Sequence, residues 1–199
     1  MIPRITLKQF KHTFSSKDYD AVACAQFLDH DTTSVIAEQA GKYLSTAAMV
    51  IDGKAGAAYE RLTSAYVGCT KFGKQQMDLS ILESKIFELA EGYTSYACCF
   101  SVVRLNPLGG MTSHRDYSYN RYLLGTLVLE GKLLFGVGSS REAAYCDNTI
   151  LTPGDFIALY APREKITDRR PYFWACAIEP DKPTLAIRAW LRECKSCLG

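Results

Sequence analysis

The fold of this chain is decided by residues 106–116, which read NPLGGMTSHRD. A β-rich stretch from Ser95 to Leu105 precedes them, and the Asn-Pro and Gly-Gly pairs are typical of turns. At the far end, His114 and Asp116 are two residues apart, so in an extended chain both side chains point to the same side. The pair can therefore grip one metal ion together. The plainer alternative is a solvated loop histidine beside an acid.

The second half of the chain is dominated by short β-branched or aromatic runs. Each run is bounded by Gly, Pro or Asn turn signals, such as Glu130-Gly131 and Thr152-Pro153-Gly154-Asp155. Besides Ser95 to Leu105, the predicted strands are Tyr122 to Glu130, Lys132 to Val137, Asp155 to Ala161, Tyr172 to Ile178 and Thr184 to Arg192.

The first half shows helical signals instead. Ser80 to Glu83 has the form of a capping box and opens a helix that Gly92 ends. The other predicted helices are Ser16 to Leu28, Val35 to Leu44 and Ala55 to Val67. Helices followed by a block of strands indicate an α+β fold in one domain, 1–199, with a mainly helical support region at 1–94 and a curled sheet at 95–193.

Composition places few limits on function. The chain has 199 residues, is 48% hydrophobic and carries a formal net charge of +2, which neither requires nor excludes a nucleic acid partner. No apolar signal segment and no membrane-length apolar run is present, so we expect an intracellular protein with no membrane contact. Most of the eight cysteines lie in apolar stretches, and Cys194 and Cys197 are read as incidental thiols of a frayed end rather than a zinc or redox pair.

The last predicted strand separates two faces. Leu185, Ile187 and Leu191 share one face, and Arg188 and Arg192 share the other with Trp190. Arginines that line a barrel need an anionic partner, and a dicarboxylate can supply one by bidentate pairing. The alternative is an edge strand with both arginines in water.

Taken in order, these motifs resemble the AlkB-like branch of the 2-oxoglutarate/iron(II) dioxygenases over residues 81–193. The matching pieces are Asn106-Pro107-Leu108-Gly109, His114-Arg115-Asp116, Gly131-Lys132-Leu133-Leu134-Phe135, Pro153-Gly154-Asp155 and the terminal arginine strand. The resemblance implies a double-stranded β-helix core, similar to a jelly roll or cupin, with the N-terminal helices packed on one side.

The same resemblance implies roles for individual residues. His114 and Asp116 would ligate Fe(II), and Arg188 would bind the distal carboxylate of 2-oxoglutarate. Arg192 would bind the proximal carboxylate or lie nearby. Asn106 or Leu105 falls where the family has a tyrosine that helps to hold the cosubstrate, so we count Asn106 among the cofactor-binding residues.

The iron site departs from the family pattern at the third ligand. A facial triad uses two histidines and one carboxylate, but the chain has three histidines in all and none follows His114. Glu164 is the substitute predicted here, with Asp168 as another possibility, because carboxylate oxygens suit Fe(II). Two ligands plus water, or a decayed site, are the remaining alternatives.

Aromatic and basic residues surround the metal motif. The predicted rim consists of Arg115, Tyr117, Tyr119, Arg169 and Arg170. Such a rim suits a nucleic acid backbone with an extruded base, and it equally suits a protein interface. The sequence thus predicts an AlkB-like oxidative demethylase or hydroxylase acting on a nucleic-acid base, or a catalytically inactive dioxygenase-fold subunit that binds nucleic acid or protein. A small-molecule hydroxylase is a weaker third prediction.

Overall fold

The computed structural model describes residues 2, 4–5, 21–47, 49–51, 59–69, 77–89, 96–114, 121–160 and 171–193. In chain order the elements are β1 (Arg4–Ile5), β2 (Ala21–Cys24), α2 (His30–Ala47), β3 (Met49–Ile51), β4 (Tyr59–Cys69), α3 (Ser80–Leu89), β5 (Tyr96–His114), β6 (Arg121–Glu130), β7 (Leu133–Gly138), α4 (Arg141–Cys146), β8 (Asn148–Leu151), β9 (Phe156–Tyr160), β10 (Tyr172–Ala177) and β11 (Thr184–Glu193).

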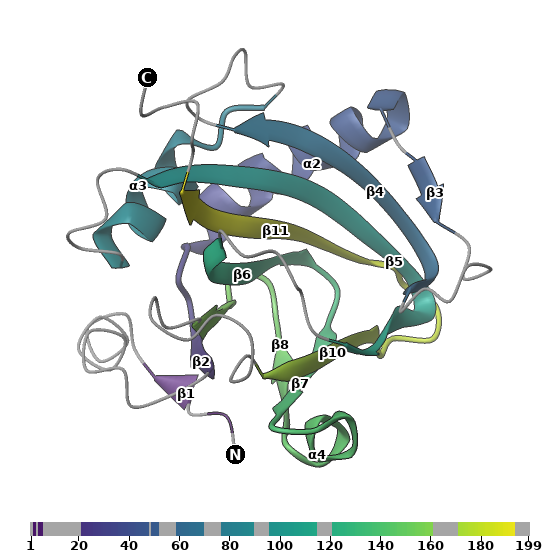
Figure 1. Cartoon of the computed structure of the whole chain (residues 1–199). Coiled ribbons are helices and arrows are strands. Elements are labelled where there is room, and N and C mark those ends of the chain that lie inside the picture. Colours follow the sequence, from purple (N-terminus) through teal and green to yellow (C-terminus); the bar gives the residue numbers. More distant parts are fainter. Residues whose placement is uncertain are drawn as a thin grey trace.

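The strands form one strongly curled sheet, in the order β1-β2-β9-β6-β11-β5-β10-β7-β8, with β4 also pairing with β5. The 19-residue strand β5 makes the curl possible because it belongs to both layers. Its first part pairs with β11 from Tyr96 to Leu105, and its last part pairs with β10 from Gly110 to His114. Figure 1 shows β4, β5, β11 and β6 as one curved layer, with β7 and β10 on the opposite side of the molecule from α2 and α3. This is a double-stranded β-helix, as predicted.

Side chains alternate between the two faces of the central strands, so the sheet has one hydrophobic core on its helix side and another inside the barrel. On β11, Leu185, Ile187 and Leu191 belong to a cluster that the helices share, whereas Trp190 packs against a second cluster inside the barrel. On β6, Leu123 and Leu127 face the helices and Leu124 and Val128 face the interior. The predicted division of β11 is therefore confirmed for Leu185, Ile187 and Leu191 on one face and Trp190 on the other.

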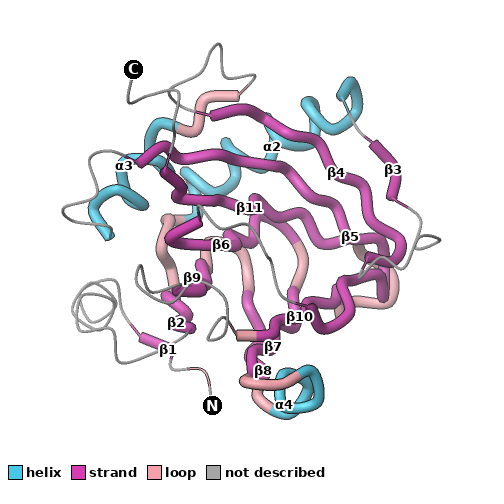
Figure 2. Tube along the Cα trace, viewed as in Figure 1, coloured by secondary structure: helices cyan, strands magenta, loops and turns pink. Residues whose placement is uncertain are grey.

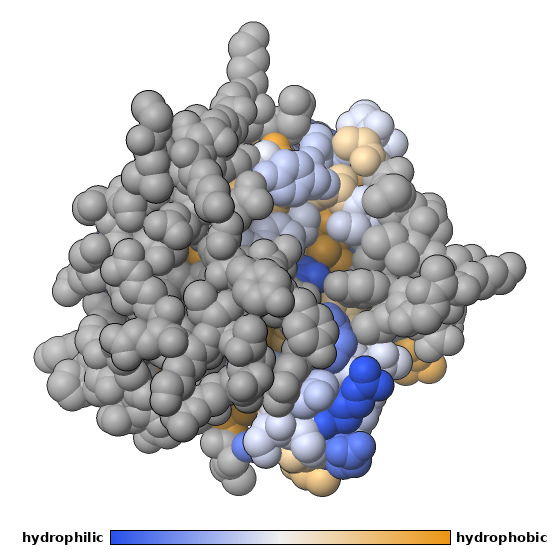
Figure 3. Space-filling model, viewed as in Figure 1, coloured by the Kyte–Doolittle hydropathy of each residue, from blue (hydrophilic) through white to orange (hydrophobic). Residues whose placement is uncertain are grey.

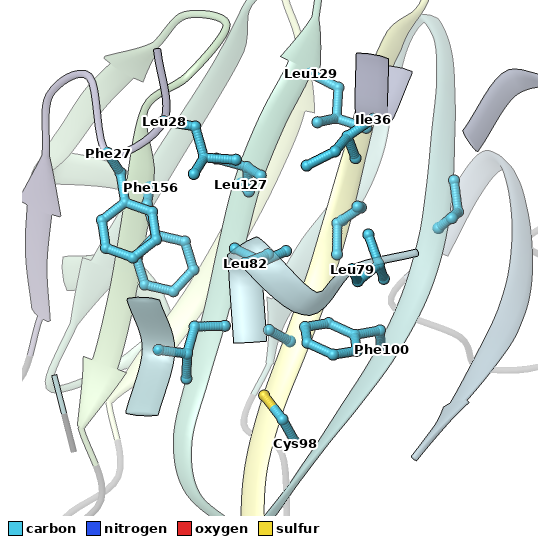
Figure 4. Close-up of a cluster of buried hydrophobic side chains, with 14 of the residues drawn as sticks. Phe27, Leu28, Ile36, Leu79, Leu82, Cys98, Phe100, Leu127, Leu129 and Phe156 are labelled. Carbon is cyan, nitrogen blue, oxygen red and sulfur yellow. The ribbon is translucent and has the colours of Figure 1, made fainter. Parts of the chain in front are cut away.

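The core beneath the helices fixes where α2 and α3 lie. Ile36 of α2 and Leu82 of α3 are buried against the sheet, and Figure 4 shows both pointing toward Leu127 and its neighbours. Phe27 and Phe156 stack beside them, with ring centres 4.6 Å apart. Figure 2 shows the same arrangement as a trace, with both helices on one side of the strand layer.

A glycine on β6 makes room for this aromatic stack. A Cβ on Gly125 would lie 2.2 Å from Cζ of Phe156. Gly125→Ala is therefore expected to lower the free energy of unfolding by about 1–3 kcal/mol, because the ring must move in a filled core. Urea denaturation measures the change. Gly41→Ala on α2 is the matched control, since a Cβ there meets nothing within 4 Å, and it is expected to stabilise by about 0.5–1 kcal/mol. Equal effects of the two substitutions would contradict this packing.

An aspartate lies just before each of the two helices α2 and α3, and the predicted hydrogen bonding at the start of α3 differs from what the structure shows. Asp29 accepts hydrogen bonds from the Thr32 amide and hydroxyl at 2.8 and 3.0 Å. The pKa of Asp29 is lowered, chiefly by the amide bond. At α3 the predicted capping box is wrong, because the Ser80 hydroxyl donates to Asp78 at 2.7 Å and the Glu83 amide bonds to the Leu79 carbonyl. The helix still starts at Ser80 as predicted.

Two predicted helices are strands. Residues 21–24 form β2, which pairs with β9, and residues 59–69 form β4, which pairs with β5. In β2 all four residues are buried, and such a run carries no period that separates strand from helix. In β4, Ala65 and Val67 are buried while Tyr66 between them is 56% exposed, which is the period of a strand. The support region at 1–94 therefore contributes strands as well as helices. None of the helices in the described part of the chain combines the length and apolarity that a bilayer crossing requires.

Candidate functional site

A register shift at the end of β5 turns His114 toward the interior. Phe173 of β10 pairs with His114, and Ala175 pairs with Met111, so two steps on β10 match three steps on β5. Met111, Phe173 and Ala175 all belong to the interior cluster. Because a β-bulge resets the alternation of side chains, His114 faces inward although it is three residues from Met111. Its ring lies against the ring of Phe173, with centres 4.4 Å apart.

The orientation of the imidazole is set by the backbone before it. His114 Nδ1 is 2.7 Å from the carbonyl oxygen of Thr112. A carbonyl oxygen only accepts, so Nδ1 carries a proton, and in the neutral ring the lone pair is on Nε2. Nε2 is buried. This is the tautomer and anchoring that metal-ligating histidines use.

α4 supports the same strand from outside. The Ser113 amide donates to the Tyr145 hydroxyl at 2.9 Å, and Trp174 Nε1 donates to the Ala144 carbonyl at 2.6 Å. The Tyr145 and Trp174 rings are in contact, with centres 5.2 Å apart. In Figure 3 the end of the molecule that carries α4 shows mainly hydrophilic colouring. α4 therefore holds the His114 end of β5 on the outer side of the barrel.

Arg188 lies inside the barrel between two aromatic rings. It is 8% exposed, and its Cζ is 5.9 Å from the ring centre of Phe173 and 5.4 Å from that of Trp190. Its register neighbours are Ser101 on β5 and Thr126 on β6, both buried. Directly paired residues share a face of the sheet, so the side chains of Ser101 and Thr126 lie on the same interior face as Arg188, one on each neighbouring strand. A buried cation with hydroxyls beside it is suited to bind a carboxylate.

Phe173 lies next to both His114, the predicted metal ligand, and Arg188, the predicted carboxylate-binding residue. Its ring contacts the His114 ring and lies 5.9 Å from the Arg188 guanidinium carbon. The structure thus brings His114 and Arg188 to the same interior wall. Sequence reasoning missed Phe173, Ser101 and Thr126, because none of them belongs to a recognisable motif. The strand period did place Trp190 beside Arg188.

The other predicted site residues divide into two groups. Asn106 is on β5 and is exposed, and Arg192 is on β11, where it pairs with Ala97 and Arg121. The side chain of Arg192 is not among the described parts of the chain, and neither is Asp168. The other predicted site residues also lie outside the described residues; they are Asp116, Glu164, Arg115, Tyr117, Tyr119, Arg169 and Arg170. The roles given to all of these residues stay predictions.

The fold family suggests an iron ion at His114, and the donor set can be tested against it. His114 itself fits the role of a metal ligand, because its Nδ1 is held by the Thr112 carbonyl. Its neighbour across the strand pair is a phenyl ring, which offers no lone pair, and His30 is an exposed residue at the start of α2. Within the described ranges no three His, Cys, Asp or Glu side chains group closely enough to hold a metal ion. The described residues therefore do not fit a triad with two histidines.

Comparison with known proteins gives the fold. The sequence matches no family profile, and no curated protein is significantly similar to it. Among solved structures, a prolyl-4-hydroxylase from Pseudomonas putida superposes with a TM-score of 0.64 at 10% identity, over 95% of this chain and 100% of that one. SnoN, a non-haem α-ketoglutarate-dependent epimerase of nogalamycin biosynthesis, gives 0.68 at 14% identity, over 94% and 82%. OsALKBH1 gives 0.63 at 12% identity, over 87% and 98%. The chain therefore has the double-stranded β-helix fold of the 2-oxoglutarate/iron(II) oxygenases.

Proposed function

We propose that this chain is a carboxylate-binding protein of the dioxygenase fold. It binds 2-oxoglutarate inside its barrel at Arg188 and acts as a non-catalytic subunit that binds nucleic acid or protein. The burial of Arg188 in the barrel, with Ser101 and Thr126 beside it on the same interior face, is the observation that carries the proposal. Its geometry suits the distal carboxylate of a dicarboxylate, whose two oxygens accept from the planar guanidinium. SnoN, which has the same fold, has been seen with Fe3+ and α-ketoglutarate bound.

Binding is tested on the full chain by tryptophan fluorescence. The chain has two tryptophans, and Trp190 lies 5.4 Å from the Arg188 guanidinium carbon. We expect 2-oxoglutarate, without added metal, to change the emission of Trp190 and to bind at least about 10-fold tighter than 2-oxovalerate, which lacks only the distal carboxylate. Trp190→Phe, which retains Trp174, identifies the source of the signal. Equal affinity for the two acids, measured by calorimetry, would count against the proposal.

A second candidate is an AlkB-like oxygenase that acts on a nucleic-acid base. The observation in its favour is the anchoring of His114, whose Nδ1 is 2.7 Å from the Thr112 carbonyl oxygen, so that the lone pair of the neutral ring is on Nε2. Asp116 and Glu164 would complete the iron site, and the rim residues would hold the nucleic acid. Succinate release from 2-oxoglutarate with Fe(II) and methylated oligonucleotides tests this candidate. Lack of turnover in both methylated and unmethylated reactions would exclude it.

The nucleic acid partner is testable apart from catalysis. Arg169→Glu and Arg170→Glu are expected to weaken oligonucleotide binding, because each substitution puts a negative charge where a phosphate contact is proposed. His114→Ala should leave such binding unchanged if the chain acts as a binding subunit. Gel-shift titrations at fixed ionic strength measure both effects.

A further inference from the structure

The residue opposite His114 decides what this end of the barrel can hold. β10 is the strand paired with the last part of β5, and Phe173 is the residue in register with His114. Its side chain is 2% exposed and faces the same interior as the imidazole. A ligand that joins His114 from the neighbouring strand would have to come from position 173.

The separation of the two rings matches that of two imidazoles on one metal ion. With metal–nitrogen distances of about 2.1 Å, two imidazoles bound at right angles have ring centres about 4.5 Å apart. The rings of His114 and Phe173 are 4.4 Å apart. The phenyl ring thus takes the place that a second imidazole would need, with carbon in place of the donor nitrogen.

The position of this phenyl ring is fixed by its other neighbours. Phe173 stacks on Phe135 with the ring planes 2° from parallel and the centres 5.9 Å apart, and Arg188 lies over it. All three belong to strands of the barrel wall. The ring is therefore part of the packed interior and lies close to both the imidazole and the guanidinium.

We infer that Phe173 occupies the third-ligand position of an oxygenase-type metal centre, so that the wild-type barrel is closed to iron and holds its carboxylate without a metal ion. The statement about the metal centre is independent of the proposed carboxylate binding. Only the statement that a carboxylate is held at Arg188 rests on the proposed function. It makes position 173 the residue that separates a binding barrel from a metal-binding one.

The test is a titration of the full chain with Co(II) alone, whose visible absorption reports bound nitrogen ligands. Phe173→His is expected to bind Co(II) at least about 10-fold tighter than the wild type. Phe173→Leu, which removes the ring and adds no donor, is the matched control and should bind no tighter than the wild type. Adding His114→Ala to Phe173→His should abolish the gain. Co(II) should also raise the melting temperature of Phe173→His and leave that of the wild type unchanged.

Two results would overturn the inference. One is wild-type binding of Co(II) that equals that of Phe173→His and is lost in His114→Ala, which would place the third ligand elsewhere in the chain. The other is a folded Phe173→His that binds no tighter than Phe173→Leu. If circular dichroism shows that Phe173→His does not fold, Mn(II) titration of the 15N-histidine-labelled wild type decides: we expect no selective broadening of the His114 signals, and selective broadening would refute the inference. The 2-oxoglutarate titration tests the proposed function separately.

Discussion

Arg188→Met is expected to weaken 2-oxoglutarate binding by about 100-fold, because it removes two charge-assisted hydrogen bonds worth together about 3 kcal/mol. Methionine is similar in length and apolar, so it can pack between Phe173 and Trp190, where the guanidinium now lies. The fold should survive, since a buried cation costs desolvation energy that methionine avoids. Calorimetry gives the affinity, and urea denaturation gives the stability.

The control for this variant is Arg141→Met. Arg141 is an exposed arginine at the start of α4, so it matches the chemical change without touching the barrel. Its affinity for 2-oxoglutarate should equal that of the wild type. If Arg188→Met kept wild-type affinity, the carboxylate would have to bind elsewhere, and the proposed function would fail.

The second large effect is expected at Asp155, where substitution by alanine should lower the free energy of unfolding by about 3–5 kcal/mol. Asp155 is 2% exposed and accepts from the Gln26 amide at 3.0 Å and from the Thr152 amide and hydroxyl at 2.9 and 2.8 Å. Each buried donor that loses its acceptor costs about 1–3 kcal/mol. Gln26 also has a φ of 51°, a strained value for a non-glycine residue that this bond helps to hold.

Urea denaturation of Asp155→Ala measures this effect. Asp181→Ala provides the comparison, because Asp181 is exposed in the turn before β11 and its loss should change stability by less than about 0.5 kcal/mol. A loss below about 1 kcal/mol for Asp155→Ala would show that water or another group takes over the three donors.

Hydrophobic periodicity and turn residues predicted the parts of the fold whose local sequence pattern is typical of only one structure. The two faces of β11 followed from strict alternation at Leu185, Ile187 and Leu191, and the turn before β9 followed from Pro153-Gly154-Asp155, where Gly154 has a φ of 86°. Prediction failed at β2 and β4, because whether an apolar run becomes strand or helix there depends on the sheet beside it. β2 completes the sheet between β1 and β9, a pairing across more than a hundred residues that no local pattern encodes.

The site was predictable only in part, for a related reason. His114 and Arg188 could be singled out because imidazole, carboxylate and guanidinium carry recognisable chemistry. The partner of His114 could not, since its identity depends on the register between β5 and β10. Sequence reasoning looked for the third ligand in residues 163–170, which lie outside the described residues, and it gave Phe173 no role. A phenylalanine in a strand has the same pattern whether it fills a core or takes the place of a ligand.

The irregular pairing of β5 with β10 is itself a determinant of the site. On a regularly pleated strand, a residue three positions after Met111 would lie on the opposite face, and the imidazole would point out of the barrel toward α4. Deleting either Thr112 or Ser113 would instead bring the histidine two positions after Met111, where regular pleating alone keeps it on the inner face. The local path of the backbone thus matters to this site as well as the identity of the residue.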